Sequence, residues 1–128
     1  MHLLTARLLV VEDDDATRKM VEDVLTSAGY DVVSASHGAE ALRLLNRDVP
    51  DVIVLDLMLP WINGIEVLST IRQQPQLSRV PVLVITGTVT STFDLRAFHP
   101  LSVMRKPLEP DALVSAVEEL LSEKPKAE

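Results

Sequence analysis

Residues 51–66 have the sequence Asp51-Val-Ile-Val-Leu-Asp-Leu-Met-Leu-Pro-Trp-Ile-Asn-Gly-Ile-Glu66. The run Val52–Leu55 contains no polar residue and is followed directly by Asp56. Two further runs have the same character, Leu8–Val11 and Val82–Ile85. Apolar residues that do not alternate with polar ones are typical of strands buried on both faces of a parallel sheet. The three runs therefore predict the central strands of such a sheet.

Weaker strands are predicted at Asp31–Ala35 and Ser102–Arg105, and segments with helical periodicity separate the strands. The expected helices are one that begins at Asp14 or Asp15 and ends at Gly29, one over about Gly38–Arg47, one over about Asn63–Gln73, and one that starts at Pro110 and includes Leu113–Leu121. Strand and helix thus alternate about five times, which predicts right-handed βαβ units and an α/β fold with helices on both faces of the sheet.

The chain has 128 residues, no cysteine and a formal net charge of −7. Without cysteine, disulfides, zinc–thiolate sites and thiol nucleophiles are excluded, and a cytoplasmic location is expected. No secretory signal or run of 18 apolar residues is present, and the acidic balance gives no electrostatic footprint for nucleic acid. We expect residues 1–121 to form one domain and residues 122–128 a flexible tail or linker.

Polar residues follow the predicted strands. Glu12–Asp15 follow the first run, Asp56 the second, Thr86 and Gly87 the third, and Lys106 the fifth strand. In an open parallel sheet the carboxyl ends of the strands form the binding edge, so these groups are expected to converge. Clustered carboxylates suit Mg²⁺, and a carboxylate can attack phosphorus to give an acyl phosphate. A lysine, a hydroxyl and a backbone N–H would hold the phosphoryl oxygens.

The sequence resembles the receiver domain of bacterial response regulators over nearly its whole length. The matching segments are Leu8-Leu-Val-Val-Glu-Asp-Asp14, residues 51–66, Val80-Pro-Val-Leu-Val-Ile-Thr-Gly87 and Met104-Arg-Lys-Pro107. The most distinctive stretch runs from Asp56 through Pro60 to Asn63-Gly64. The resemblance implies a flavodoxin-like, doubly wound five-stranded parallel sheet with strand order 2-1-3-4-5.

The resemblance also implies a role for each matching residue. Asp56 would be the phosphoacceptor, and Thr86 the switch hydroxyl. Lys106, aimed into the crevice by a cis bond before Pro107, would meet the phosphoryl group. Mg²⁺ would be held by the carboxylates of Glu12, Asp13 and Asp56 and by the backbone carbonyl of Met58. The backbone of Gly87 would contact the phosphoryl group. The implied partners are a histidine kinase or histidine phosphotransfer protein and a downstream output protein or domain, with no direct binding to nucleic acid or membrane. Such a switch assists its own phosphorylation and dephosphorylation without being a conventional enzyme.

Two features depart from the family pattern. Most members carry Tyr or Phe three residues before the lysine, where this chain has Val103. The segment from Thr88 to Leu101 is short and rich in poor helix formers, with helical promise only over Phe93–Phe98. We therefore expect an atypical fourth helix that is short, displaced or mobile.

Other interpretations remain open for this sequence. Asp14 and Asp15 fit a helix cap and a favourable first-turn charge, and Trp61 fits loop packing better than a binding role. The chain can be part of a longer regulator, or a receiver-like binding module that switches little. An aspartyl phosphatase ranks last, because Met58 stands where such enzymes carry a second aspartate.

Overall fold

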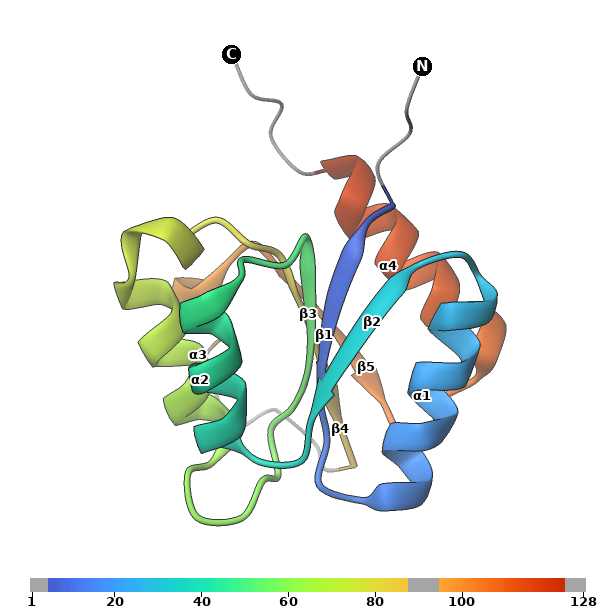
Figure 1. Cartoon of the computed structure of the whole chain (residues 1–128), viewed down its shortest axis with the longest axis horizontal. Coiled ribbons are helices and arrows are strands. Elements are labelled where there is room, and N and C mark those ends of the chain that lie inside the picture. Colours follow the sequence, from blue (N-terminus) through green and yellow to red (C-terminus); the bar gives the residue numbers. More distant parts are fainter. Residues whose placement is uncertain (1–4, 88–94, 124–128) are drawn as a thin grey trace.

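The computed structural model describes residues 5–87 and 95–123 (Figure 1). Its strands are β1 (Arg7–Val11), β2 (Asp31–Ala35), β3 (Val52–Asp56), β4 (Val82–Thr86) and β5 (Leu101–Arg105). Its helices are α1 (Asp15–Ser27), α2 (Gly38–Arg47), α3 (Gly64–Gln73) and α4 (Pro110–Glu123), with 3-10 turns η1 (Pro75–Leu77) and η3 (Arg96–Phe98). The predicted strand boundaries are correct to within one residue. None of the described helices has the length and apolar character that a membrane span requires.

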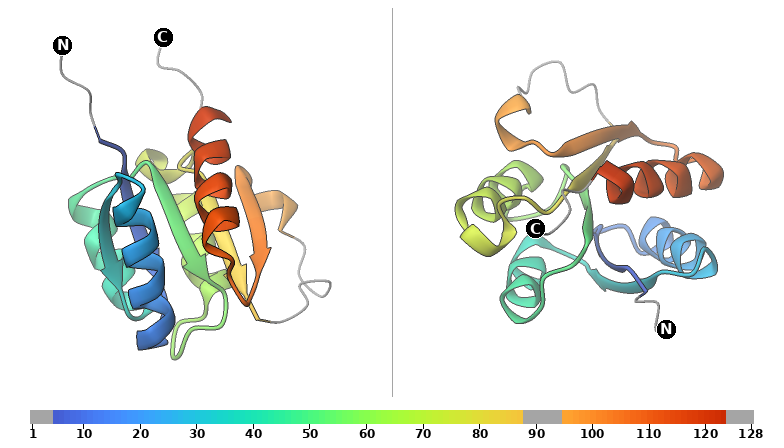
Figure 2. Two further views of the ribbon diagram at one scale, coloured as in Figure 1. Left: turned by 90° about the vertical axis from the view of Figure 1, so that its right-hand side faces the viewer. Right: turned by 90° about the horizontal axis from the view of Figure 1, so that it is seen from above.

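The five strands form one parallel sheet in the order β2-β1-β3-β4-β5, as predicted. Every residue of β3 and β4 is buried, as are the last four of β1. The helices lie in two layers, α2 and α3 on one face and α1 and α4 on the other (Figure 2). This two-sided cover explains why the central strands are continuously apolar.

Successive residues along a strand serve opposite sides of the sheet, because side chains alternate between its faces. Leu9 and Val11 of β1 belong to the core beneath α2 and α3. Leu8 and Val10 belong to the core beneath α1 and α4. Each apolar run therefore contributes to two cores at once, which fixes the position of its carboxyl end between the layers.

The helix ends follow the sequence signals. Asp14 caps α1, because its Oδ2 atom accepts a 2.8 Å hydrogen bond from the Thr17 backbone N–H. Gly29 follows that helix with φ of 101°, a left-handed conformation that glycine adopts without a steric cost. Asn63 caps α3 through a bond to the Glu66 N–H, so the helix itself begins one residue later than predicted.

The connection between β4 and β5 contains no α-helix in its described part, residues 95–100. The regular element within residues 95–100 is the 3-10 turn η3, which is consistent with the expected atypical fourth helix. Of the predicted helical stretch Phe93–Phe98, residues 93 and 94 lie outside the described residues, and Leu95 directly precedes η3. Arg72 of α3 fastens this connection, because its guanidinium donates to the backbone carbonyls of Phe98, Pro100 and Leu77 at 2.6, 2.9 and 3.1 Å.

At the carboxyl end of the chain, α4 continues through Glu123, so the first two residues of the expected tail are helical. Residues 124–128 lie outside the described part of the chain. The start of β1 and the end of α4 both lie at the edge of the sheet opposite to the carboxyl ends of the strands (Figure 1).

Candidate functional site

The predicted site residues meet at the carboxyl edge of the sheet, at the lower edge of Figure 1. Asp56 and Thr86 are the last residues of β3 and β4, while Glu12 and Lys106 directly follow β1 and β5. Glu12, Asp56 and Thr86 are 0%, 2% and 0% exposed. Buried acids need partners, since an isolated charge in the interior is costly. The arrangement therefore has to be explained by the groups around these carboxylates.

Lys106 is the cation that meets both buried acids. Its Nζ atom lies 2.7 Å from Glu12 Oε1 and 2.9 Å from Asp56 Oδ2. Its backbone N–H donates a 2.9 Å hydrogen bond to the carbonyl of Thr86, which continues the β4–β5 ladder to the edge of the site. The Lys106–Pro107 peptide bond is cis, as the sequence led us to expect.

The other atom of the Asp56 carboxylate is also held. Asp56 Oδ1 accepts a 2.9 Å hydrogen bond from the backbone N–H of Met58. One carboxylate oxygen thus faces a backbone donor and the other faces an ammonium group. These two interactions orient the carboxylate, a group that can act as a nucleophile toward phosphorus.

Three carboxylates, those of Glu12, Asp13 and Asp56, offer oxygens that all lie within 4.8 Å of one another. Buried Glu12 Oε1 accepts no well-aligned hydrogen bond from the described residues, although it lies close to Lys106, so it has capacity for a further ligand. An all-oxygen donor set of this charge suits a hard divalent cation such as Mg²⁺. The residues present therefore fit a magnesium ion.

The protonation of Glu12 reflects this crowding. Burial raises the pKa of Glu12 from its ordinary value of 4.5 to about 7, although Lys106 and the Asp14 N–H act in the opposite direction. Burial also disfavours the charged form of Lys106, but its interactions with Glu12 and Asp56 outweigh that effect and raise its pKa. The ammonium group is thus firmly charged.

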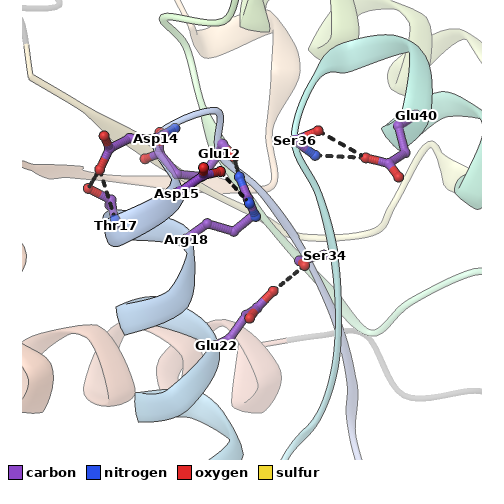
Figure 3. A network of polar contacts seen from close by, with 9 residues as sticks. All are labelled: Glu12, Asp14, Asp15, Thr17, Arg18, Glu22, Ser34, Ser36 and Glu40. Atoms are coloured by element: carbon purple, nitrogen blue, oxygen red, sulfur yellow. Dashed lines mark hydrogen bonds and ion pairs between the residues drawn. The ribbon is translucent and has the colours of Figure 1, made fainter.

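The β1–α1 loop is fixed by a polar network (Figure 3). The Asp14 N–H donates to Glu12 Oε2 at 3.1 Å, and Arg18 donates to the Glu12 carbonyl at 3.0 Å. Arg18 also forms a 2.6 Å ion pair with Asp15. As predicted, Asp14 and Asp15 therefore serve the helix start, while Glu12 and Asp13 remain for the site.

Gly64 brings the start of α3 against the end of β3. A Cβ atom at this position would lie 2.4 Å from Leu57 Cα and 2.5 Å from the Asp56 carbonyl oxygen. The Gly64 N–H donates a 2.9 Å hydrogen bond to the Leu57 carbonyl. This close contact with α3 fixes the position of the backbone that carries Asp56.

Trp61 corrects one interpretation of the sequence. The sequence favours loop packing for this residue over a binding role, but the structure leaves it 85% exposed. Its one aromatic contact among the described residues is with His37, edge to face with ring centroids 5.6 Å apart. Its φ is 63°, in the left-handed region that bulky side chains avoid. No pattern in the sequence reveals either property.

The remaining predicted residues lie beside this cluster. Gly87 follows Thr86 directly at the end of β4, and no atom of the described residues lies within 4 Å of the position that a Cβ atom would take. Val103 is 41% exposed on the edge strand β5. The roles predicted for Thr86, Gly87 and the Met58 carbonyl stay predictions.

The fold and the site define a class of protein: a doubly wound α/β domain with an acidic cluster and a lysine at the carboxyl edge. The family model of the response regulator receiver domain matches residues 8–118. The chain is 35% identical over 121 residues to the transcriptional regulatory protein GlrR of Escherichia coli, covering 92% of this chain and 27% of GlrR. It is 40% identical over 84 residues to the alkaline phosphatase synthesis transcriptional regulatory protein PhoP of Bacillus subtilis, covering 66% of this chain and 34% of PhoP.

Solved structures agree with this assignment. The chemotaxis protein CheY4 of Vibrio cholerae superposes with a TM-score of 0.87 at 30% identity, covering 92% of this chain and 100% of CheY4. The receiver domain of the sensor histidine kinase PA1611 of Pseudomonas aeruginosa, which has magnesium coordinated in its active-site cleft, superposes with a TM-score of 0.85 at 26% identity, covering 94% of this chain and 100% of that domain.

The chain belongs to the response regulator receiver domain family of two-component signalling systems. Members of this family are signalling switches rather than conventional enzymes. The chain spans between about a quarter and a third of the length of the two curated relatives described above.

Proposed function

We propose that this receiver domain accepts a phosphoryl group on Asp56 from a phosphohistidine of a histidine kinase or histidine phosphotransfer protein. The observation that supports the proposal best is the Asp56 carboxylate itself. It is almost completely buried, and its two oxygens accept hydrogen bonds from the Lys106 ammonium group and the Met58 N–H. A carboxylate that lies beside a cation and two further acids is suited to phosphoryl transfer.

The transfer is a substitution at phosphorus. An oxygen of Asp56 forms a bond to phosphorus while the bond from phosphorus to the donor imidazole nitrogen breaks. The imidazole keeps the electron pair of the broken bond and takes a proton from solvent. The product is an acyl phosphate on Asp56, and no general base is required because the attacking group is already a carboxylate.

Mg²⁺ would be held by Glu12, Asp13, Asp56 and the backbone carbonyl of Met58. When bound, this ion neutralises charge on the phosphoryl oxygens. Lys106 neutralises charge from the other side, because its ammonium group already lies 2.9 Å from Asp56 Oδ2. The Thr86 hydroxyl and the Gly87 N–H hold the remaining phosphoryl oxygens at the end of β4. Water then attacks phosphorus in the same site, and the bond from phosphorus to the Asp56 oxygen breaks. Inorganic phosphate leaves, and Asp56 returns to a free carboxylate.

The phosphorylated domain would change its affinity for an output domain or a separate output protein. Both curated relatives described above are transcriptional regulatory proteins that are longer than this chain. We propose that Thr86, buried at the end of β4 and adjacent to β5, passes the change at Asp56 to this edge of the sheet. Val103 lacks the volume of an aromatic side chain, so the rearrangement would proceed without an aromatic swing.

The test is the intact mass of the purified protein after incubation with acetyl phosphate and Mg²⁺. One phosphoryl group should add to the unsubstituted protein, none should add without Mg²⁺, and none should add to Asp56→Asn. Asp14→Asn is the matched control, because it changes an adjacent acid of the same edge that serves as a helix cap. No addition to a folded, unsubstituted protein would contradict the proposal and leave a binding module with a receiver fold.

A further inference from the structure

The exposure and the backbone strain of Trp61 cost free energy in the isolated domain, and the fold does not offset this cost. Its indole is 85% exposed, and its backbone holds φ at 63°. Neither feature is needed to form the β3–α3 loop, since Gly or Asn adopts this conformation with less strain. The edge-to-face contact with His37 orients the indole but buries little of it. A strained and exposed large aromatic residue is typical of a residue that contacts a partner.

The position of Trp61 restricts what that partner can be. Met58, on the same loop, is 55% exposed, and its backbone N–H is bonded to the Asp56 carboxylate. His37 belongs to the neighbouring β2–α2 loop, which approaches the β3–α3 loop closely at Gly38. We name Met58, Trp61 and His37 the Trp61 patch. A protein seated on this patch also lies over the rim of the Asp56 site.

The surroundings of the patch are acidic. Asp13, Asp14 and Asp15 are exposed on the β1–α1 loop at the same edge of the sheet, and Glu66 is exposed at the start of α3. A second copy of this chain would oppose an equally acidic rim, and each copy has a net charge of −7. The charges therefore disfavour self-association and favour an apolar partner surface rimmed by lysine or arginine.

We infer that the Trp61 patch docks the phosphohistidine-bearing domain that phosphorylates Asp56, through an apolar surface flanked by basic residues. This inference rests on the proposed function. A donor protein has to bring its histidine to the Asp56 carboxylate, and it therefore covers the adjacent loops. The indole supplies a rigid apolar anchor whose burial adds to the affinity of the encounter complex.

The inference separates two kinds of phosphodonor. Acetyl phosphate is small and reaches Asp56 without covering Trp61. A protein donor gains binding energy from the indole before the chemical step. Loss of the indole should therefore raise KM for the protein donor much more than it changes kcat.

The experiment compares three variants with the unsubstituted protein. Trp61→Gly removes the indole and relieves the left-handed backbone, so its urea midpoint should rise or stay the same. Trp61→Phe retains an aromatic anchor. Val49→Ala is the matched control, because Val49 is a large apolar residue, 44% exposed, between α2 and β3 at the opposite edge of the sheet. The probes are acetyl phosphate and a panel of phosphorylated histidine kinases and phosphotransfer domains from the source genome.

With the panel member that phosphorylates the unsubstituted protein fastest, Trp61→Gly should lose about 10- to 100-fold in kcat/KM, a size typical of a central anchor residue. Trp61→Phe should recover most of this loss, and kcat/KM of Val49→Ala should be within about twofold of the unsubstituted protein. With acetyl phosphate as donor, the phosphorylation rates of the variants and the unsubstituted protein should differ less than they do with the protein donor.

An equal effect of Trp61→Gly on both kinds of donor, or no effect on either, would overturn the inference and leave the phosphoacceptor role intact. The inference is also overturned if no panel member phosphorylates a protein that acetyl phosphate does phosphorylate. If acetyl phosphate also fails with the unsubstituted protein, the proposed function fails and the inference fails with it.

Discussion

The Nζ atom of Lys106 lies 2.9 Å from Asp56 Oδ2, although their strands are not neighbours in the sheet. Asp56 ends β3, Lys106 follows β5, and β4 lies between these two strands. The same ammonium group lies 2.7 Å from Glu12 Oε1. One positive charge therefore serves two buried acids, and exposed Asp13 adds a third carboxylate to the cluster. The site has an excess of negative charge until a cation binds, and several measurable properties follow from that imbalance.

Lys106→Met should destabilise the metal-free protein. Removing the ammonium group leaves Glu12 and Asp56 buried without a cation, and unpaired buried charges cost several times more than surface pairs. We expect the free energy of unfolding at pH 8 to fall by about 1 to 3 kcal/mol, measured by urea denaturation in EDTA. At pH 5.5 the loss should be smaller, because Glu12 can then take up a proton.

The control for this variant is Lys19→Met. Lys19 pairs with Asp23 at 3.2 Å on the exposed side of α1, and such pairs contribute less than about 1 kcal/mol. Equal losses in the two variants would show that the Lys106 ion pairs contribute no more to the free energy of unfolding than an exposed surface pair.

Glu12→Gln should make the stability of the metal-free protein less dependent on pH. Burial raises the pKa of Glu12 to about 7, above its ordinary value of 4.5. The folded state thus binds the proton more tightly than the unfolded state, so this contribution to stability is present below pH 4.5 and is lost as the pH rises through about 7. At 1.36 kcal/mol for each pH unit, the loss reaches at most about 3 kcal/mol.

The glutamine carries no charge at any pH, so the variant should be more stable than the unsubstituted protein at pH 8 and similar to it at pH 5. Urea denaturation in EDTA at both values measures the difference. Glu119→Gln, at an exposed position of α4, controls for the loss of one surface charge. The same Glu12 variant should bind Mg²⁺ more weakly by calorimetry. A variant that is less stable at pH 8 would contradict this account of the carboxylate.

The sequence predicted most of the fold and of the acidic site for a simple geometric reason. Parallel strands all point the same way, so whatever follows each apolar run arrives at one edge of the sheet. Glu12, Asp13, Asp56 and Lys106 could therefore be placed together without knowledge of any contact. The cap at Asp14 was equally accessible, because it depends on the few residues that follow it.

Features that depend on distant parts of the chain could not be predicted in this way. A lone tryptophan is usually well buried, so its pattern favoured packing, and only the path of the β3–α3 loop leaves Trp61 exposed. Likewise, Arg72 fits a surface position on a helix that is rich in polar residues. Its three carbonyl partners come from η1 and from residues 26 and 28 positions further along the chain.

Gly64→Ala should damage both the fold and the site. The added methyl group would lie 2.4 Å from Leu57 Cα and 2.5 Å from the Asp56 carbonyl, and both are backbone atoms that cannot rotate away. We expect a loss of about 3 kcal/mol, at the upper end of overpacking effects, and slower phosphorylation by acetyl phosphate in the protein that remains folded.

Gly87→Ala is the matched control for folding, because no atom of the residues that the structure describes lies within 4 Å of the position that its methyl group would take. Its urea midpoint should stay close to that of the unsubstituted protein. Similar losses of stability in the two alanine variants would show that the contact between β3 and α3 is not tight.

Arg72→Gln should loosen the junction between η3 and β5. The guanidinium bonds to the carbonyls of Phe98, Leu77 and Pro100 at once, and the last two also accept backbone N–H groups of Val80 and Val82. Within the described residues the Phe98 carbonyl accepts its hydrogen bond from Arg72, so the shorter glutamine leaves that carbonyl without compensation. We expect a loss of about 2 kcal/mol in the free energy of unfolding.

The local consequence of this substitution should be visible in amide hydrogen exchange. The Val82 N–H donates to the Pro100 carbonyl at 3.1 Å at the start of the β4–β5 pair, so its protection should fall in Arg72→Gln. Arg72→Lys should be intermediate, because a single ammonium group cannot span carbonyls that a planar guanidinium reaches from three nitrogens. Arg43→Gln is the control, since Arg43 is exposed and only 3.7 Å from Glu40, and it should lose less than about 0.5 kcal/mol. If exchange at Val82 is unchanged while global stability falls, Arg72 supports α3 alone. If both change together, Arg72 holds the start of the strand that delivers Lys106 to Asp56.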